Sequence, residues 1–225
     1  MKKQEAGLLF LSTLLASLSG FINALGILIY STPVSHFTGN TTNSSIAFVQ
    51  GEYQVFLRVF STIIFFLVGG ITSGYVLEEK EFNPGKRYGM MLLFIGIALF
   101  LNFHFIDIER GFLQVLAFLC GMQNGLFITY KGMTVRMTHI TGGLTDMGVY
   151  IGNYLRKKHS DVWKIKFLLT LILGFFAGGI VGSMSYFSFG KDSFLLASAG
   201  YLSSGFIYFI WRNRGIRRGT LYCNY

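Results

Sequence analysis

The feature that most constrains this chain is the length of its stretches without Asp, Glu, Lys or Arg. Six of them are long enough to cross the roughly 30 Å hydrocarbon core of a bilayer as helices, which takes about 20 residues. These stretches are 6–30, 59–77, 88–106, 111–130, 167–190 and 193–211. Only 13% of the 225 residues are charged, which excludes a soluble core inside a charged surface. We therefore expect an all-α integral membrane protein whose residues 1–225 form a single membrane domain.

Two polar segments break this pattern, and they resemble each other. The first is 34–50 and the second is 137–155. Each contains the motif His-x-Thr-Gly, which begins at His36 in the first segment and at His139 in the second. Both segments are too polar to face lipid and short for a full crossing at about 1.5 Å per helical residue. The sequence therefore predicts about six transmembrane helices plus two short polar helices that are re-entrant or half-length.

The order of span, polar helix, span, span occurs twice, which predicts two repeats, 6–106 and 111–212. With three spans each, the repeats are inverted relative to one another. Six spans with both termini in the cytoplasm place 16 of the 19 Lys and Arg residues on the cytoplasmic side, and eight spans place 13 there. The positive-inside rule favours six. The eight-span alternative, with parallel repeats, stays open, and residues 213–225 are expected to form a basic cytoplasmic tail.

Pairs of glycines lie in the middle of two predicted spans, and further glycines follow or precede them at a spacing of four. Small residues at this spacing let two helix backbones approach closely in a membrane. We assign helix packing to Gly69, Gly70, Gly74, Gly178, Gly179 and Gly182.

The starts of the two polar helices carry the candidate functional groups. Thr38 and Thr141 are expected N-caps, and a helix start at membrane depth presents free N–H groups to an anion or a carbonyl oxygen. Asn43 in the first helix corresponds to Asp146 in the second, the only carboxylate in either. An ionisable group at that depth is a functional candidate by default. The alternatives are that Asp146 pairs with Arg136 or lies nearer the membrane interface.

The remaining candidates each have a functional and a structural interpretation. The imidazoles of His36 and His139 could shuttle protons or donate to a substrate oxygen, or they could satisfy a loop carbonyl. Asn23 and Asn124 occupy equivalent places within spans, where an amide either bridges helices or lines a path. Arg136 is either an interface anchor or an anion ligand at the mouth of the second polar helix.

These observations lead to two functional hypotheses. The first is a small-solute transporter or channel whose path runs between the two polar helices. The second is a membrane scaffold or assembly factor that does not transport, in which the polar helices pack against each other. The predicted path residues are Asn23, His36, Thr38, Asn40, Asn43, Asn124, Arg136, His139, Thr141, Thr145 and Asp146.

Other classes of function have no support in the sequence. The net charge of +9 would favour nucleic acid in a soluble protein, but the basic residues stand in short blocks between apolar stretches, where they set membrane orientation. The expected partners are therefore the lipid bilayer and a small molecule or ion. The histidines lack the spacing of metal ligands, so we expect no metal and no cofactor. No nucleophile elbow, P-loop or dinucleotide fingerprint is present, so no enzyme is expected.

The paired motifs resemble those of the YoaK-like family of uncharacterised small bacterial membrane proteins. They are Gly-Phe-Ile-Asn-Ala at 20–24, His-Phe-Thr-Gly-Asn at 36–40, Gly-Met-Gln-Asn-Gly at 121–125 and Arg-x-Thr-x-x-Thr-Gly at 136–142. The resemblance covers essentially the whole chain and implies about six spans in a bacterial inner membrane. The family usually has Asp where this chain has Asn23, so the resemblance does not support a mechanism that needs an acid there.

Overall fold

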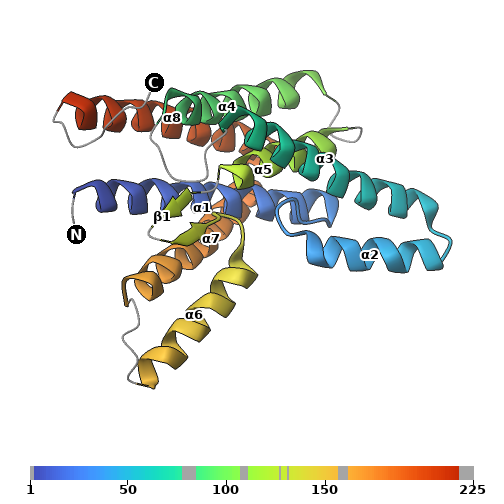
Figure 1. Cartoon of the computed structure of the whole chain (residues 1–225). Coiled ribbons are helices and arrows are strands. Elements are labelled where there is room, and N and C mark those ends of the chain that lie inside the picture. Colours follow the sequence, from blue (N-terminus) through green and yellow to red (C-terminus); the bar gives the residue numbers. More distant parts are fainter. Residues whose placement is uncertain are drawn as a thin grey trace.

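The computed structural model describes residues 3–77, 85–106, 111–126, 128–130, 132–156 and 162–217 (Figure 1). Its helices are α1 (Lys3–Tyr30), α2 (Phe37–Val49), α3 (Tyr53–Leu77), α4 (Lys86–Phe105), α5 (Phe112–Gly125), α6 (Ile140–Leu155), α7 (Val162–Phe189) and α8 (Ser193–Arg217). A short 3-10 helix, η1 (Gly190–Asp192), joins α7 to α8. Two strands, β1 (Ile128–Tyr130) and β2 (Met133–Val135), form an antiparallel hairpin in which Ile128 pairs with Val135.

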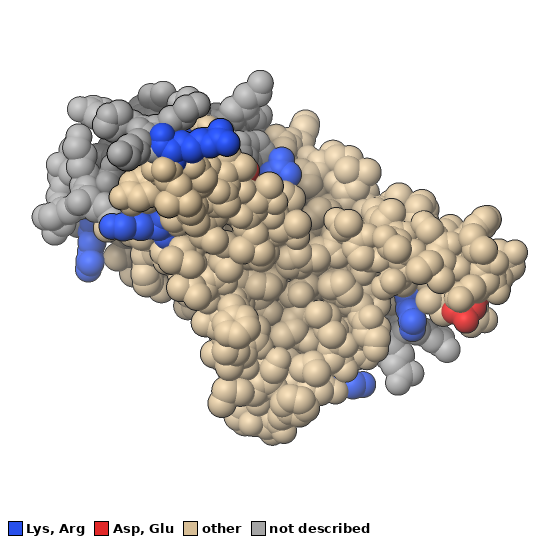
Figure 2. Space-filling view, turned by 90° about the horizontal axis from the view of Figure 1, so that it is seen from below, with Lys and Arg blue, Asp and Glu red and all other residues tan. Residues whose placement is uncertain are grey.

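The chain is a helical membrane protein. Within the described residues, four helical segments are long and apolar enough to cross a membrane. They are Ala6–Tyr30, Tyr53–Leu77, Lys86–Phe105 and the 55-residue segment Val162–Ile216, which contains α7, η1 and α8. Figure 2 shows one face of the molecule, with most Lys and Arg toward its left side and a broad uncharged area beside them. An uncharged area of this extent is suited to lipid contact.

The predicted span 111–130 is wrong in its extent. The helix in this region, α5, has 14 residues and ends at Gly125, and the remaining residues enter the hairpin. The sequence Ile-Thr-Tyr at 128–130 favours a strand, and Gly132 takes the positive φ of 74° that the turn requires. Most of α5 is buried in protein, so the helix does not need the length of a lipid-exposed span. Apart from this short hairpin, the regular structure of the described residues is helical, which agrees with the predicted helical class.

Three helix pairs make the tightest contacts: α1 with α7, α3 with α5, and α4 with α8. Glycines lie at the closest points of the first two pairs. A Cβ on Gly20 would overlap the carbonyl oxygen of Phe175, and a Cβ on Gly121 would overlap that of Phe66. These contacts correspond to each other, because Gly20 and Gly121 begin the matched Gly-x-x-Asn motifs. Each close approach joins a helix of the first half of the chain to a helix of the second.

The predicted packing glycines take part in these contacts to different extents. A Cβ on Gly69 would overlap a backbone carbonyl of α5, and one on Gly178 would overlap a backbone carbonyl of α1. A Cβ on Gly182 would lie 2.7 Å from the Phe21 carbonyl oxygen, whereas Gly70 and Gly179 have more room. The prediction is wrong for Gly74, which is exposed and has nothing within 4 Å of its Cβ position.

The two polar helices branch from the bundle (Figure 1). Among the helices, α2 packs only against α3, and α6 packs only against α7. In Figure 1 both begin near the middle of the molecule, and α2 extends to the right while α6 extends to the lower left. The first turn of α1 and the last turn of α8 lie together on the left.

The backbone contact at Gly121 can be tested with the smallest possible side chain. We expect Gly121→Ala to lower the midpoint of thermal unfolding by several degrees, because α3 and α5 must separate to accommodate the methyl group. The matched control is Gly74→Ala, which adds the same methyl group to a helix with open space around it. It should leave the midpoint unchanged or raise it slightly, since Ala favours a helix by up to about 1 kcal/mol over Gly. Equal midpoints for the two variants in detergent micelles would contradict the contact.

Candidate functional site

The buried side chain of Asn23 holds the loop between α1 and α2. Its Oδ1 accepts hydrogen bonds from the backbone N–H of Val34 at 3.1 Å, from the N–H of Ser35 at 3.2 Å and from the Ser35 hydroxyl at 2.9 Å. Asn23 lies two helical turns, or about 10 Å, before the end of α1 at Tyr30. The chain therefore turns back along α1 before α2 begins. The amides of Val34 and Ser35 obtain at this depth the partner that water cannot provide.

The second polar helix is held in a similar way. Asn124, near the end of α5, accepts a hydrogen bond of 2.6 Å from the hydroxyl of Thr138 through its Oδ1. Thr138 immediately precedes His139, just as Ser35 immediately precedes His36. An asparagine in a helix thus fixes the hydroxyl residue before each histidine.

The N-cap positions of both helices belong to the histidines, so the prediction that Thr38 and Thr141 are N-caps is wrong. The helices begin at Phe37 and Ile140, and no side chain caps either one. The asparagine clamps fix where the helices begin, with each N-cap two residues earlier than expected, which places both threonines inside the first turn. Their carbonyls accept the hydroxyls of Thr42 and Thr145, at 3.2 and 3.1 Å.

The two histidines are close enough to interact electrostatically. The Nδ1 of His36 lies 2.9 Å from the Ser35 hydroxyl, and its ring meets the edge of the Phe175 ring with centroids 5.3 Å apart. Burial, and then the nearby His139, lowers the pKa of His36 below its ordinary value. His139 is exposed, and its ring folds over Gly142, where a Cβ would overlap it. The equivalent Gly39 has open space.

The structure does not gather the other predicted path residues around the histidines. Asn40 is buried and donates a 2.8 Å hydrogen bond from Nδ2 to the carbonyl of Pro33, which gives it a structural contact. The side chains of Thr38, Asn43, Arg136, Thr141, Thr145 and Asp146 are exposed. No Cα of α2 lies within 8 Å of a Cα of α6, so Asn43 and Asp146 lie on helices that do not meet. For the same reason, the form of the scaffold hypothesis in which the polar helices pack against each other is wrong.

Sequence reasoning missed the two hydroxyl residues, Ser35 and Thr138. Both could have been identified from the sequence, because each stands directly before one of the two repeated histidines. It also missed a buried polar contact deeper in the bundle. Gln123 donates from Nε2 to the carbonyl of Leu15 at 2.8 Å and accepts at Oε1 from the hydroxyl of Tyr201. This contact joins α1, α5 and α8, and no local pattern indicates it.

The side chains and backbone groups around the two histidines offer hydrogen bonds. Among the residues that the structure describes, no group of three or more His, Cys, Asp and Glu could hold a metal ion. The N-cap positions carry imidazoles, and the first turns of the two helices present backbone N–H groups, which suit an anion or a carbonyl oxygen.

Comparison with known proteins confirms the resemblance to an uncharacterised membrane family. The family described as "Protein of unknown function (DUF1275)" matches residues 11–208. A relative from Rhizobium meliloti (strain 1021), named "UPF0700 transmembrane protein RA0705", is 26% identical over 187 residues, which are 81% of this chain and 77% of the relative. No solved structure matches the chain.

The proximity of the two histidines predicts a measurable change in titration. We expect His139→Ala to raise the pKa of His36, because the repulsion by a second imidazolium is removed, but not to its ordinary value, since burial is the larger cause. The pKa can be followed by nuclear magnetic resonance of histidine-labelled protein, with His36→Ala assigning the signal. His104→Ala removes an exposed imidazole at the end of α4 and serves as the control. An unchanged His36 pKa in His139→Ala would show that the rings do not face each other.

The clamp at Asn23 predicts which substitutions the loop tolerates. Asn23→Asp should retain a folded protein, because an ionised carboxylate can accept the same three hydrogen bonds. Asn23→Leu has similar volume but no acceptor, and it leaves the amides of Val34 and Ser35 unsatisfied at about 1–3 kcal/mol each. The midpoint of thermal unfolding should therefore fall far more for Leu than for Asp. If the midpoint falls equally in both variants, the hydrogen bonds accepted by Asn23 do not stabilise this loop.

Proposed function

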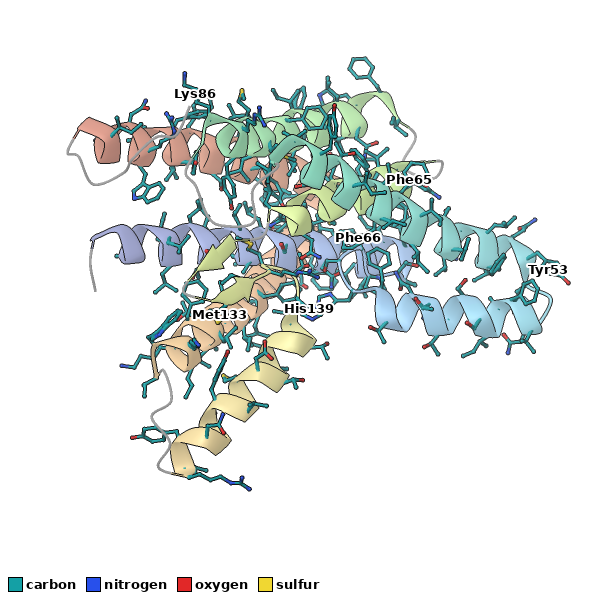
Figure 3. The ribbon with its side chains drawn as sticks, in the orientation of Figure 1. Tyr53, Phe65, Phe66, Lys86, Met133 and His139 are labelled. Carbon is teal, nitrogen blue, oxygen red and sulfur yellow. The ribbon has the colours of Figure 1, made fainter. Side chains whose placement is uncertain are left out.

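We propose that this chain, which belongs to the family described as "Protein of unknown function (DUF1275)", is a small-solute transporter or channel. The observation that carries the proposal is that His36 and His139, the N-cap residues of the two polar helices, lie close enough to interact electrostatically. Helices α2 and α6 begin near the middle of the molecule and diverge from there (Figure 3). Two half-length helices that start at membrane depth are a recurring construction of substrate sites in transporters.

The exposed polar groups of α2 and α6 support a water-filled path. The hydroxyls of Thr42 and Thr145 bond back to their own helix backbones, so lipid contact would cost them little. The amide of Asn43 and the carboxylate of Asp146 have no hydrogen-bonding or ionic partner among the described residues. Amides and carboxylates are costly to expose to hydrocarbon. Both side chains are therefore assigned to surfaces that water reaches.

The proposal includes six crossings arranged as two inverted repeats, 6–106 and 111–212, in a bacterial inner membrane with both termini cytoplasmic. Three observations support it. The glycine contacts of the two halves correspond, as do the asparagine clamps. The start of α4 at Lys86 lies on the left of Figure 3, the side on which α1 begins and α8 ends, and Tyr53 lies on the right. Basic residues at the end that holds the termini agree with the positive-inside rule.

Within such a path the helix starts and the histidines have distinct tasks. The free N–H groups of the first turns attract a substrate oxygen. His36, with its lowered pKa, stays neutral at physiological pH and offers a hydrogen bond without a fixed charge. Asp146 is the group in the polar helices that can carry a proton if transport is proton-coupled.

A scaffold that binds a partner chain is the second candidate, and one observation favours it. Helix α6 has no buried residue and packs only against α7, so its outer side is available to a partner. Cysteine accessibility separates the two functions. We would introduce Thr42→Cys and Thr145→Cys with Cys223 replaced by Ser and the buried Cys120 retained. Labelling of both positions by a membrane-impermeant aqueous reagent supports a path, and full protection in native membranes supports a partner.

Transport itself is tested by flux into proteoliposomes across a panel of anions, amino acids and metabolites. We expect Asp146→Asn and the double variant His36→Ala, His139→Ala each to lower the flux of the transported solute by about tenfold or more, the scale of one lost charged hydrogen bond. The matched control for the acid is Glu52→Gln, an exposed carboxylate in the turn between α2 and α3, and it should behave as wild type. Equal flux in the wild type and all three variants would show that Asp146 and the two histidines do not contribute to transport.

A further inference from the structure

The imidazole of His36 is held by a chain of hydrogen bonds that starts at Asn23. The Oδ1 of Asn23 accepts the backbone N–H groups of Val34 and Ser35, at 3.1 and 3.2 Å. Because a backbone N–H can only donate, the atom of the Asn23 amide that faces this loop is its oxygen. The Ser35 hydroxyl lies 2.9 Å from that oxygen and 2.9 Å from Nδ1 of His36. This hydroxyl therefore stands between an amide oxygen and a ring nitrogen.

The single proton of the Ser35 hydroxyl fixes the tautomer of His36. Two oxygens 2.9 Å apart need a proton between them, so the hydroxyl donates to Asn23 Oδ1. The oxygen of Ser35 is then an acceptor toward His36, and Nδ1 has to carry the proton that it donates. A neutral imidazole has one N–H group, so the Nε2 of His36 carries a lone pair and accepts hydrogen bonds.

The Nε2 of His36 is open to a hydrogen-bond donor. This nitrogen forms no hydrogen bond to any residue that the structure describes. His36 is partly exposed, and its Nε2 is not one of the buried polar atoms that lack a partner in the described chain, so this nitrogen keeps accessible surface. The ring is also held from α7 by its edge-on contact with Phe175, with the ring planes 83° apart. The imidazole is thus fixed in place with one acceptor unused.

The second half of the chain has the same clamp without this lock. The Thr138 hydroxyl donates to Asn124 Oδ1 at 2.6 Å, and among the described residues the His139 side chain has no hydrogen-bond partner. The ring of His139 lies over Gly142 instead. No neighbour therefore fixes its tautomer, and the two N-cap histidines are not equivalent. An acceptor of fixed position occurs at His36 alone of the two.

We propose that His36 is locked as the Nδ1–H tautomer and accepts a hydrogen bond from the transported solute through Nε2, which makes it a specificity-determining residue. This inference rests on the function proposed above and narrows the substrate class. The solute carries an N–H or O–H donor beside the oxygen that the helix starts attract, as an α-amino acid or an α-hydroxycarboxylate does. Ser35 and Asn23 are positioning residues, because they act through the imidazole.

The lock is tested by ¹⁵N nuclear magnetic resonance of histidine-labelled full-length protein, at a pH at which the imidazoles are neutral. The signal of His36, assigned with His36→Ala, should show a protonated Nδ1 and an unprotonated Nε2. The exposed His104 has no hydrogen-bond partner among the described residues, and it should show the mixture of tautomers in which Nε2–H predominates. Ser35→Ala should move His36 to that mixture, and Thr138→Val, which removes the matched hydroxyl, should not. If Ser35→Ala does not fold, the wild-type chain decides, because a protonated Nε2 in wild-type His36 overturns the proposal whether or not the protein transports.

The donor requirement is tested by flux into proteoliposomes with two matched pairs, glycine with glycine betaine and L-lactate with 2-methoxypropionate. Each pair keeps the carboxylate, and the second member lacks the donor. The second member should enter wild-type vesicles about tenfold more slowly, the scale of one hydrogen bond, and His36→Ala should remove the difference. Equal flux within both pairs, or a difference that persists in His36→Ala, overturns the role of His36 and leaves transport standing. If no solute of the wider panel is transported, the function proposed above is wrong and the acceptor role falls with it, while the resonance result still decides the lock.

Discussion

The arrangement of this protein depends on a buried amide oxygen that accepts three hydrogen bonds. A loop that turns back into a membrane protein takes its N–H groups away from water, and each must find a partner. Asn23 supplies that partner to Val34 and Ser35 from a position about two turns before the end of α1. The depth of Asn23 in its helix therefore sets the depth at which α2 begins. That in turn fixes the position of His36, the last residue before the helix.

The clamps are in place only because the helices that carry them are packed across the two halves of the chain. The carbonyl of Phe175 in α7 approaches Gly20 of α1, and the ring of the same residue meets His36. Phe66 of α3 has a comparable double contact, with its carbonyl against Gly121 and its ring against Phe37 at 4.3 Å between centroids. Both ring contacts hold the start of α2, one from the second half of the chain through Phe175 and one from the first half through Phe66. The close approaches at Gly20 and Gly121 each need a helix from both halves, so the halves are packed as partners of one another.

The sequence predicted those parts of the structure that are determined locally. The lengths of the uncharged stretches predicted the long helices. The repeated His-x-Thr-Gly motif located the starts of α2 and α6 to within a few residues. The features that the sequence did not predict are determined by contacts between residues that are far apart in the chain. The N-cap shifted from Thr38 to His36 because Asn23 fixes the loop, and Gly74 stays free because α3 faces nothing at that position. Hydropathy also cannot separate a strand from the end of a span, so the sequence predicts a span that continues through β1 to residue 130.

The two halves share a framework but differ where chemistry would occur. Gly39 has open space, whereas Gly142 lies under the imidazole of His139. The polar helix of the first half carries an amide at Asn43, and that of the second carries a carboxylate at Asp146. A framework of matched contacts can be duplicated without change, since packing needs only shape. A site that responds to charge needs an ionisable group, and among the candidate residues in α2, α6 and their N-caps these groups are Asp146, His36 and His139. If the proposed path responds to protons, the response therefore arises in α6 or at the two helix starts, because α2 itself carries only neutral side chains.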